Sequence, residues 1–242
     1  MKEPKSEEIP EDLFENPSVA IADYSDNLEE IQAACNVIFG RLLEPAEFAD
    51  LISAPNHSEL TIEAQRNNPN IELKLGYRLF NGTHDYILYV EAETNKRIVQ
   101  FDTIANQDTA PDGLETLLFA RQVRSFRDFG MDEIRLYAEG HAGHPSINGY
   151  YVWARFGFVM FLTGFAPQLA AAGFAPAETT LEIFAQNNGD DWWYNNGSAR
   201  EAVFYLEEGS DCRQALQIYL DGLAGKGKIE WRKKHTKKRI TP

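Results

Sequence analysis

The sequence has little cysteine and no long apolar run. Its 242 residues include two cysteines, Cys35 and Cys212, both within predicted helices, which excludes a disulfide framework and suits a reducing compartment. No stretch approaches the ~20 apolar residues that a membrane span requires, and the acidic N-terminal end lacks the apolar core of a secretory signal. We therefore expect a cytoplasmic protein without membrane contact.

Several common catalytic motifs are also missing. The sequence contains no Walker-type loop, no Gly-x-Ser-x-Gly turn, no His-Glu-x-x-His and no Cys-x-x-Cys. The chemistries that depend on those motifs are therefore not indicated. The composition, 43% hydrophobic and 12% aromatic, excludes a wholly disordered chain and allows one sizeable core.

Acidic residues dominate, except at the C-terminal end. Asp and Glu number 37 against 23 Lys and Arg, a net charge of −14, yet residues 226–242 hold eight basic residues and one acidic residue. A body so negative repels nucleic acid, so only this tail could bind phosphates. The alternative interpretation is a solvated tail that keeps the protein soluble.

Periodicity and turn residues predict an α/β fold with one mixed sheet. An acidic arm over 1–16 precedes a strand over 18–24, a helix that begins near Asp26 and a second helix over 45–53. Short turns then separate four strands, which must be antiparallel neighbours. These strands are Leu60–Gln65, Ile71–Phe80, Tyr86–Ala92 and Ile98–Ile104.

The clearest pattern is a strand–helix–strand crossover. Asp112 and Glu115 have the spacing of a capping box, and the helix that they open ends at Gly130. A strand over Ile134–Ala138 follows, and such a crossover is normally parallel and right-handed. The aromatic stretch YYVWARFGF predicts a short helix that ends at Gly157.

The last third of the chain has less regular patterns. Strands are predicted over Thr180–Ala185 and Ala202–Leu206, on either side of a Gly/Asn/Trp-rich loop, and a final helix is capped by Ser210. The predicted organisation is one domain over 17–225 with an insertion at about 159–200, followed by the basic tail.

The stretch from about Ile98 to Val159 resembles the core of the GNAT superfamily of N-acetyltransferases. It has that superfamily's order of strand, Gly-containing turn, long helix, strand, loop and short helix, and Trp153-Ala-Arg155-Phe-Gly157-Phe158 corresponds to its Tyr-x-Lys/Arg-x-Gly-Phe ending. The resemblance implies a central mixed sheet flanked by helices, here with a C-terminal elaboration. It also implies acetyl-CoA as cosubstrate, held by Gly113, Leu114 and Arg155.

Some residues depart from the superfamily's pattern. Ala110 and Glu115 stand where the phosphate-binding turn has Arg/Gln and Gly/Ala. A capping box of Asp112 and Glu115 would occupy the amides at the start of the helix. Its carboxylates would also repel a phosphate, and the repulsion would cost ~4 kcal/mol for each pair of like charges ~4 Å apart in an effective dielectric near 20. The sequence therefore predicts structural capping at this turn.

The resemblance also leaves the acid and the base of acetyl transfer open. Trp153 stands where a tyrosine acid is usual, and an indole N–H is not a usable acid near neutral pH. Tyr150, three residues earlier, is the stand-in as acid, and Glu139 or His141 would be the base. The alternative for the YYVW cluster is packing against the sheet.

Two further clusters admit two interpretations each. Glu139, His141 and His144 could hold a metal or form an exposed polar loop, and we expect no metal there. The segment from Asp190 to Trp193 could wall a pocket for a cation or a sugar, or its tryptophans could fill the core.

Two functions remain open. In the first, the protein is an N-acyltransferase that moves an acetyl group from acetyl-CoA to a cationic amine such as a polyamine, an aminoglycoside or a protein lysine, which the acidic body would attract. In the second, the fold is catalytically inactive and binds a protein partner as an interaction or regulatory module through its aromatic loops and basic tail. The turn over 110–115 discriminates between them.

Overall fold

The computed structural model describes most of the chain between residues 20 and 224. The predicted arm over 1–16, the tail over 226–242 and residues 106–112, which include Ala110 and Asp112, lie outside the described residues. The division into arm, domain and tail therefore stays a prediction. The described ranges are 20–22, 28–56, 58–67, 70–79, 82–105, 113–144 and 147–224.

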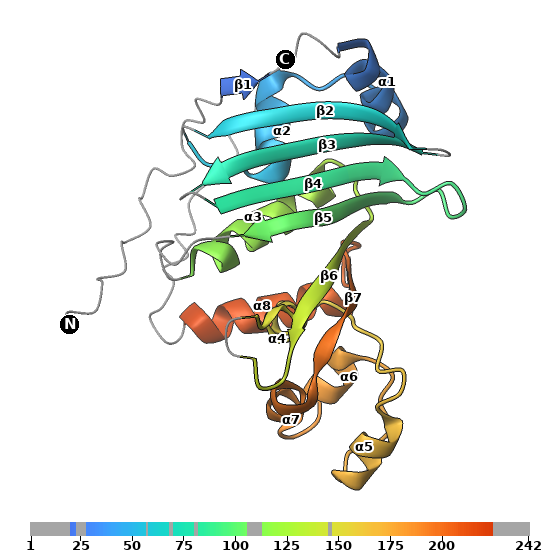
Figure 1. Ribbon diagram of the computed structural model, residues 1–242, viewed down its shortest axis with the longest axis vertical. Coiled ribbons are helices and arrows are strands. Elements are labelled where there is room, and N and C mark those ends of the chain that lie inside the picture. Colours follow the sequence, from blue (N-terminus) through green and yellow to red (C-terminus); the bar gives the residue numbers. More distant parts are fainter. Residues whose placement is uncertain are drawn as a thin grey trace, which may run out of the picture.

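The described residues form a seven-stranded mixed sheet whose strands lie in chain order (Figure 1). Strands β2 to β5 are an antiparallel meander, as predicted; β1 joins β2 in parallel, β6 joins β5 in parallel, and β7 is antiparallel to β6. The strands are β1 (Ala20–Ala22), β2 (Glu59–Asn67), β3 (Asn70–Leu79), β4 (Gly82–Val90), β5 (Arg97–Ala105), β6 (Glu133–His141) and β7 (Ser198–Tyr205).

Helices α1 to α3 lie against one face of the meander, and α5 to α7 form the far end of the molecule, beyond β6 and β7 (Figure 1). The mixed α/β architecture with a C-terminal elaboration is therefore confirmed. No helix in the described ranges is long and apolar enough to cross a bilayer. The helices are α1 (Leu28–Phe39), α2 (Pro45–Ile52), α3 (Leu114–Asp128), α4 (Gly149–Arg155), α5 (Ala166–Ala171), α6 (Thr180–Phe184), α7 (Gly189–Asn196) and α8 (Asp211–Ala224).

The core lies between the meander and its helices because the strands alternate. In β4, every second residue from Gly82 to Leu88 is buried, and its neighbours are partly exposed. The helices supply the opposing apolar faces, for example Leu118, Phe119 and Phe126 on α3. Most buried side chains of the described chain form a single hydrophobic cluster.

Two predictions for the last third of the chain were wrong. The predicted strand Thr180–Ala185 is helix α6, and most of the predicted Gly/Asn/Trp-rich loop is helix α7. The Thr179 hydroxyl caps α6 by accepting from the Glu182 amide at 3.4 Å. The Thr180 hydroxyl donates to the Phe158 carbonyl at 3.1 Å and accepts from the Met160 amide. Thr180, the β-branched residue at the start of the predicted strand, is thus used for tertiary bonds, and Thr179 just before it serves as a cap.

The start of α3 also differs from the prediction. Gly113, not Asp112, occupies the N-cap position, in a left-handed conformation with φ 83° that favours glycine, and no side chain of the N-cap bonds to the helix. Glu115 is therefore the second helical residue rather than the third. The predicted capping box is wrong, because the helix begins one residue later than the Asp-x-x-Glu spacing suggested.

Candidate functional site

The parallel strands β5 and β6 meet only at one end and then separate, forming a fork. Their pairing covers residues 98–100 of β5 and 133–135 of β6, whereas β5 continues to Ala105 and β6 to His141. Figure 1 shows the two strands diverging beyond these pairs. Beyond Gln100, β5 is paired with β4 but has no strand on its other edge within the described chain. Within the described chain, the β6-facing edge of β5 beyond Gln100 therefore has no neighbouring strand.

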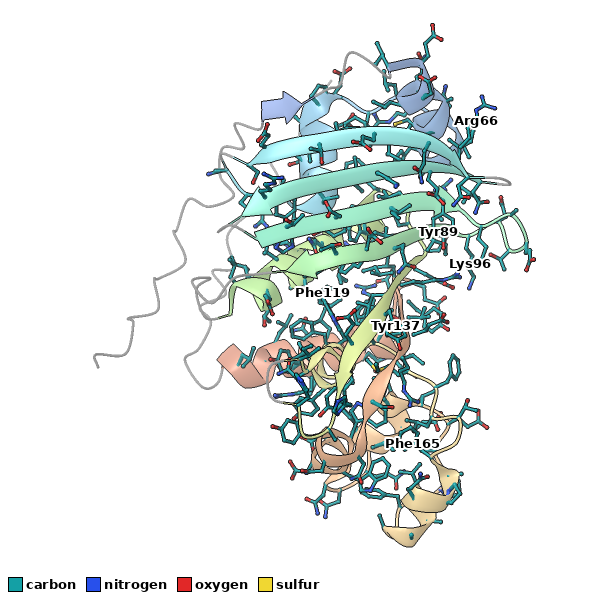
Figure 2. All side chains as sticks on the ribbon, in the orientation of Figure 1. Arg66, Tyr89, Lys96, Phe119, Tyr137 and Phe165 are labelled. Carbon is teal, nitrogen blue, oxygen red and sulfur yellow. The ribbon has the colours of Figure 1, made fainter. Side chains whose placement is uncertain are left out.

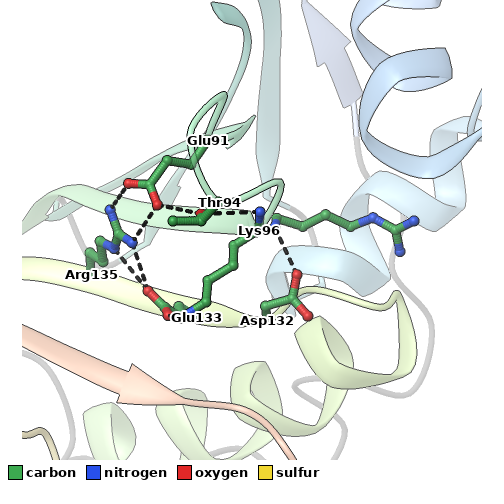
Figure 3. A network of polar contacts seen from close by, with 7 residues as sticks. Glu91, Thr94, Lys96, Asp132, Glu133 and Arg135 are labelled. Carbon is green, nitrogen blue, oxygen red and sulfur yellow. Dashed lines mark hydrogen bonds and ion pairs between the residues drawn. The ribbon is translucent and has the colours of Figure 1, made fainter.

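A network of charged side chains clamps the closed end of the fork (Figure 3). Arg135 of β6 donates to the Glu91 carboxylate at 2.6 and 3.2 Å and to Glu133 at 2.8 and 3.0 Å. Lys96 pairs with the other oxygen of Glu133, and the Thr94 hydroxyl donates to Glu91 at 2.6 Å. The clamp ties the β4–β5 turn to the start of β6.

The clamp stabilises the ionised form of its carboxylates. The hydrogen bonds from Arg135, and then from Thr94, lower the pKa of Glu91 from 4.5 to about 2. The same bonds with Glu91 raise the pKa of Arg135 above its ordinary value. The sequence analysis missed these residues because Glu91 and Arg135 lie 44 positions apart, and charged residues so far apart carry no local signal.

Aromatic rings fill the open end of the fork. Phe101 of β5, Phe119 of α3 and Trp153 of α4 lie with ring centroids 5.7 to 6.3 Å apart. A Cβ on Gly149 would come within 3.0 Å of the Glu139 carbonyl oxygen and 3.5 Å of Trp153 Cδ1, so this glycine lets α4 start directly against β6. The Trp153 indole thereby reaches Phe101 of β5 from a helix that starts against β6.

Phe119 is the centre of this packing (Figure 2). Besides Phe101 and Trp153, its ring contacts three further rings at centroid distances of 5.3 to 5.4 Å. Phe119 itself is only 2% exposed. These three further partners are Phe156, Phe158 and Phe204.

A small cavity remains where β4, β5, α3 and α4 meet. Its volume is about 20 Å³, which is room for a single water. Polar side chains of its lining are His84, Glu115 and Gln122, and Trp153 closes one side. The His84 ring is buried and stacks on the Tyr77 ring, with the ring centroids 4.8 Å apart and the ring planes 7° from parallel. The imidazole is therefore held in a fixed position.

The sequence analysis did not select His84 and Gln122. Gln122 Nε2 donates to the Tyr86 hydroxyl at 2.6 Å and to the Ile52 carbonyl at 3.1 Å, which fixes α3 against α2 and β4. The available signal was the period-two pattern of β4, which places His84 on the same buried face as Tyr86 and Leu88.

The residues predicted to hold the cofactor lie in two places. Gly113 is the N-cap of α3, two residues before Glu115 at the fork cavity, and the Leu114 side chain is fully buried. Arg155 is exposed, and its guanidinium lies over the Tyr219 ring at 4.8 Å and near Tyr151 at 5.6 Å. The structure therefore places Gly113 close to the fork and directs Arg155 toward α8.

The predicted acid, Tyr150, faces α7. Its hydroxyl donates to the Tyr194 carbonyl at 2.6 Å, its own carbonyl accepts from Trp193 Nε1 at 3.0 Å, and the residue is 2% exposed. Burial raises the pKa of the Tyr150 phenol. The packing interpretation of the YYVW cluster therefore describes its contacts, and the acid role of Tyr150 stays a prediction.

The predicted bases lie at the end of β6. Glu139 and His141 are exposed, His141 Nδ1 lies 2.9 Å from the Ala142 carbonyl oxygen, and the His141 and His144 rings meet edge to face at 5.4 Å. Among the residues that the structure describes, no group of three or more His, Cys, Asp or Glu could hold a metal ion. The base role of Glu139 or His141 stays a prediction.

Comparisons with known proteins add little to this geometry. No family model and no curated protein matches the chain. A comparison with solved structures finds Arabidopsis thaliana Naa50 in complex with the bisubstrate analogue CoA-Ac-MVNAL, at 17% identity, over 57% of this chain and 80% of that chain, with a TM-score of 0.27. A superposition at that score does not support a functional assignment.

The fold assignment rests on the order and pairing of the elements. The chain runs from β5 through α3 to a parallel β6, then through a loop to the short helix α4, which is followed by Gly157 and Phe158. The sheet splays between β5 and β6. This is the mixed α/β arrangement that the resemblance to the GNAT superfamily implies, and the described part of the chain has it.

Proposed function

We propose that this protein is an N-acyltransferase that binds acetyl-CoA in the fork between β5 and β6. The observation that carries the proposal is the short pairing of these strands, over 98–100 and 133–135, followed by divergence. The pantetheine arm of coenzyme A contains two amides. Those amides are suited to pair with the free edge of β5 as a neighbouring strand would.

The start of α3 supports binding of the pyrophosphate. A helix N-terminus attracts anions because its first N–H groups are unpaired and its dipole end is positive. Gly113 has no side chain to occupy these groups, and its left-handed conformation brings only backbone to the turn. The sequence analysis expected Asp112 at the N-cap position, which Gly113 occupies instead.

Chemistry at the fork requires a base for the acceptor amine and an acid for the thiolate. Glu139 or His141 takes the ammonium proton in this proposal, at the exposed end of β6 where a cationic acceptor would arrive. Tyr150 protonates the thiolate once its bond to the Tyr194 carbonyl is broken. His84, which lines the cavity itself, is the alternative base.

The aromatic filling favours a second candidate, an inactive interaction module. A cavity of about 20 Å³ does not hold a thioester, so binding requires Trp153 to move away from Phe101 and Phe119. Trp153 is half-buried, so part of its ring already faces solvent. If the indole stays in place, the fork is core, and the protein acts through a partner.

Thermal melting with acetyl-CoA separates the two candidates. A ligand at 100 times its dissociation constant adds ~2.7 kcal/mol of stability, which for a domain of this size raises the Tm by ~5–10 °C. We expect such an increase for the wild-type protein, together with a change in tryptophan fluorescence as Trp153 moves.

The variant Glu115→Gln tests the same proposal through the charge at the start of α3. Glu115 lines the fork cavity and is exposed at the start of α3, so removing its charge should strengthen acetyl-CoA binding several-fold. Glu63→Gln, on the exposed side of β2, is the matched control and should leave binding unchanged. If neither the wild-type protein nor Glu115→Gln is stabilised by acetyl-CoA, the acyltransferase proposal is wrong and the interaction module remains.

A further inference from the structure

A larger hollow lies in the C-terminal elaboration, away from the fork. It has a volume of about 610 Å³ and is bounded by the end of α5, the α6–α7 turn and one side of α7. Figure 1 shows these helices at the opposite end of the molecule from the meander. This volume is within the range of small-molecule sites, and neither the clamp nor the fork cavity shares its residues.

One wall of the hollow is aromatic and fixed. The Trp192 ring meets Phe165 edge to face at 6.0 Å and Phe174 at 5.8 Å. Figure 2 labels Phe165 in this region. Trp192 and Phe174 line the hollow and are both half-buried, so part of each ring stays accessible. Trp193, in contrast, is fully buried, as one of the two interpretations of this segment predicted.

The remaining wall is rich in amides. Asn195 Nδ2 donates to the Asp191 carbonyl at 2.7 Å and Asn196 Nδ2 donates to the Trp192 carbonyl at 2.8 Å, which holds both side chains in place. Their Oδ1 atoms accept no hydrogen bond in the described part of the chain. The side chains of Asn187 and Asp191, also in the lining, make none there either.

This combination selects a class of ligand. An amide donates and accepts, and so does a hydroxyl, so a wall of asparagines matches a polyhydroxylated ligand. An ammonium ion uses only the oxygens and favours carboxylates, of which the lining contains Asp191 alone. The accessible part of the Trp192 ring suits the apolar C–H face of a sugar ring.

We propose that the hollow between α5 and α7 is a binding site for a pyranose sugar, oriented by Asn187, Asp191 and Asn195 and packed against Trp192. The proposal is independent of acyl transfer at the fork, because the two places share no lining residue.

Saturation-transfer NMR on the full chain tests this with methyl α-D-glucopyranoside, methyl β-D-galactopyranoside and N-acetylglucosamine as probes. We expect at least one probe to bind with millimolar affinity that does not change with NaCl concentration, since the ligand is uncharged. Asn187→Ala should weaken that binding about fivefold, the loss expected for one neutral hydrogen bond.

Asn36→Ala, an exposed asparagine on α1, is the matched control and should bind as the wild-type protein does. Because Asn187 is exposed, its replacement should leave the melting temperature unchanged, which separates lost binding from lost folding. No transfer from any of the three sugars would overturn the proposal. So would spermidine binding that is abolished by Asp191→Asn, because the hollow would then be a cation site.

Discussion

Phe119→Ala should lower the free energy of unfolding by about 3–5 kcal/mol, the range for removing a fully buried large aromatic side chain. Five rings surround Phe119, and they come from β5, α4, β7 and the segment after α4. Truncation would leave a cavity that these rings can refill only in part. The loss should therefore lie at the upper end of the range.

Urea denaturation followed by circular dichroism measures this effect. Phe119→Leu, which keeps most of the volume, should cost about 1–1.5 kcal/mol. Ile218→Ala is the control, because Ile218 on α8 is 73% exposed, and it should change stability by less than ~0.5 kcal/mol. A loss below ~1 kcal/mol for Phe119→Ala would contradict the packing described for the fork.

Arg135→Ala should lower the free energy of unfolding by about 2–4 kcal/mol, the second largest loss predicted for a single substitution in this protein after Phe119→Ala. Arg135 links Glu91 to Glu133, and the Glu133 side chain is only 4% exposed, so its charge would lose one of two partners in a buried setting. Removing one member of a buried ion pair costs more than the pair contributes, because a charge is left unpaired. Arg127→Ala is the control, because it breaks an exposed ion pair with Asp128. It should change the free energy of unfolding by less than ~0.5 kcal/mol.

The clamp also sets a pH dependence. The pKa of Glu91 is about 2 in the folded protein and near 4.5 without its partners. A carboxylate whose pKa is lower in the folded state stabilises the fold above its unfolded pKa. This contribution should therefore be complete above pH 4.5 and disappear as the pH falls toward 2. Urea denaturation across this range should show a smaller decline for Arg135→Ala; an equal decline would contradict the assignment.

The sequence predicted the elements that depend on local patterns. The meander strands alternate and are separated by short turns, and the crossover helix has one apolar face between two glycines, so all were found. Helix α6 was missed because Thr179 and Thr180 favour strands by propensity, whereas their hydroxyls are used in a cap and in tertiary bonds. Helix α7 was missed because its glycine and asparagines are typical of a loop.

The site was harder to predict than the fold. The position of Gly113 and the cluster around Trp153 were visible as motifs, but the filling of the fork depends on Phe101, Phe119 and Trp153 meeting from three elements. The clamp likewise joins residues that are distant in sequence. Such groupings follow from the register of β5 and β6 rather than from any local spacing.

The fork also constrains the order of folding. The meander is built from adjacent hairpins and needs only local contacts, whereas β6 can reach β5 only after the whole α3 crossover has formed and docked. We therefore expect the rate-limiting step to be the docking of α3 through Phe119. Stopped-flow refolding should give φ-values near 0.5–0.8 for conservative substitutions on the buried face of α3 and near zero in α7. φ-values near zero on α3 and high in α7 would contradict this order, because the two halves of the sheet would then associate before the helix between them is in place.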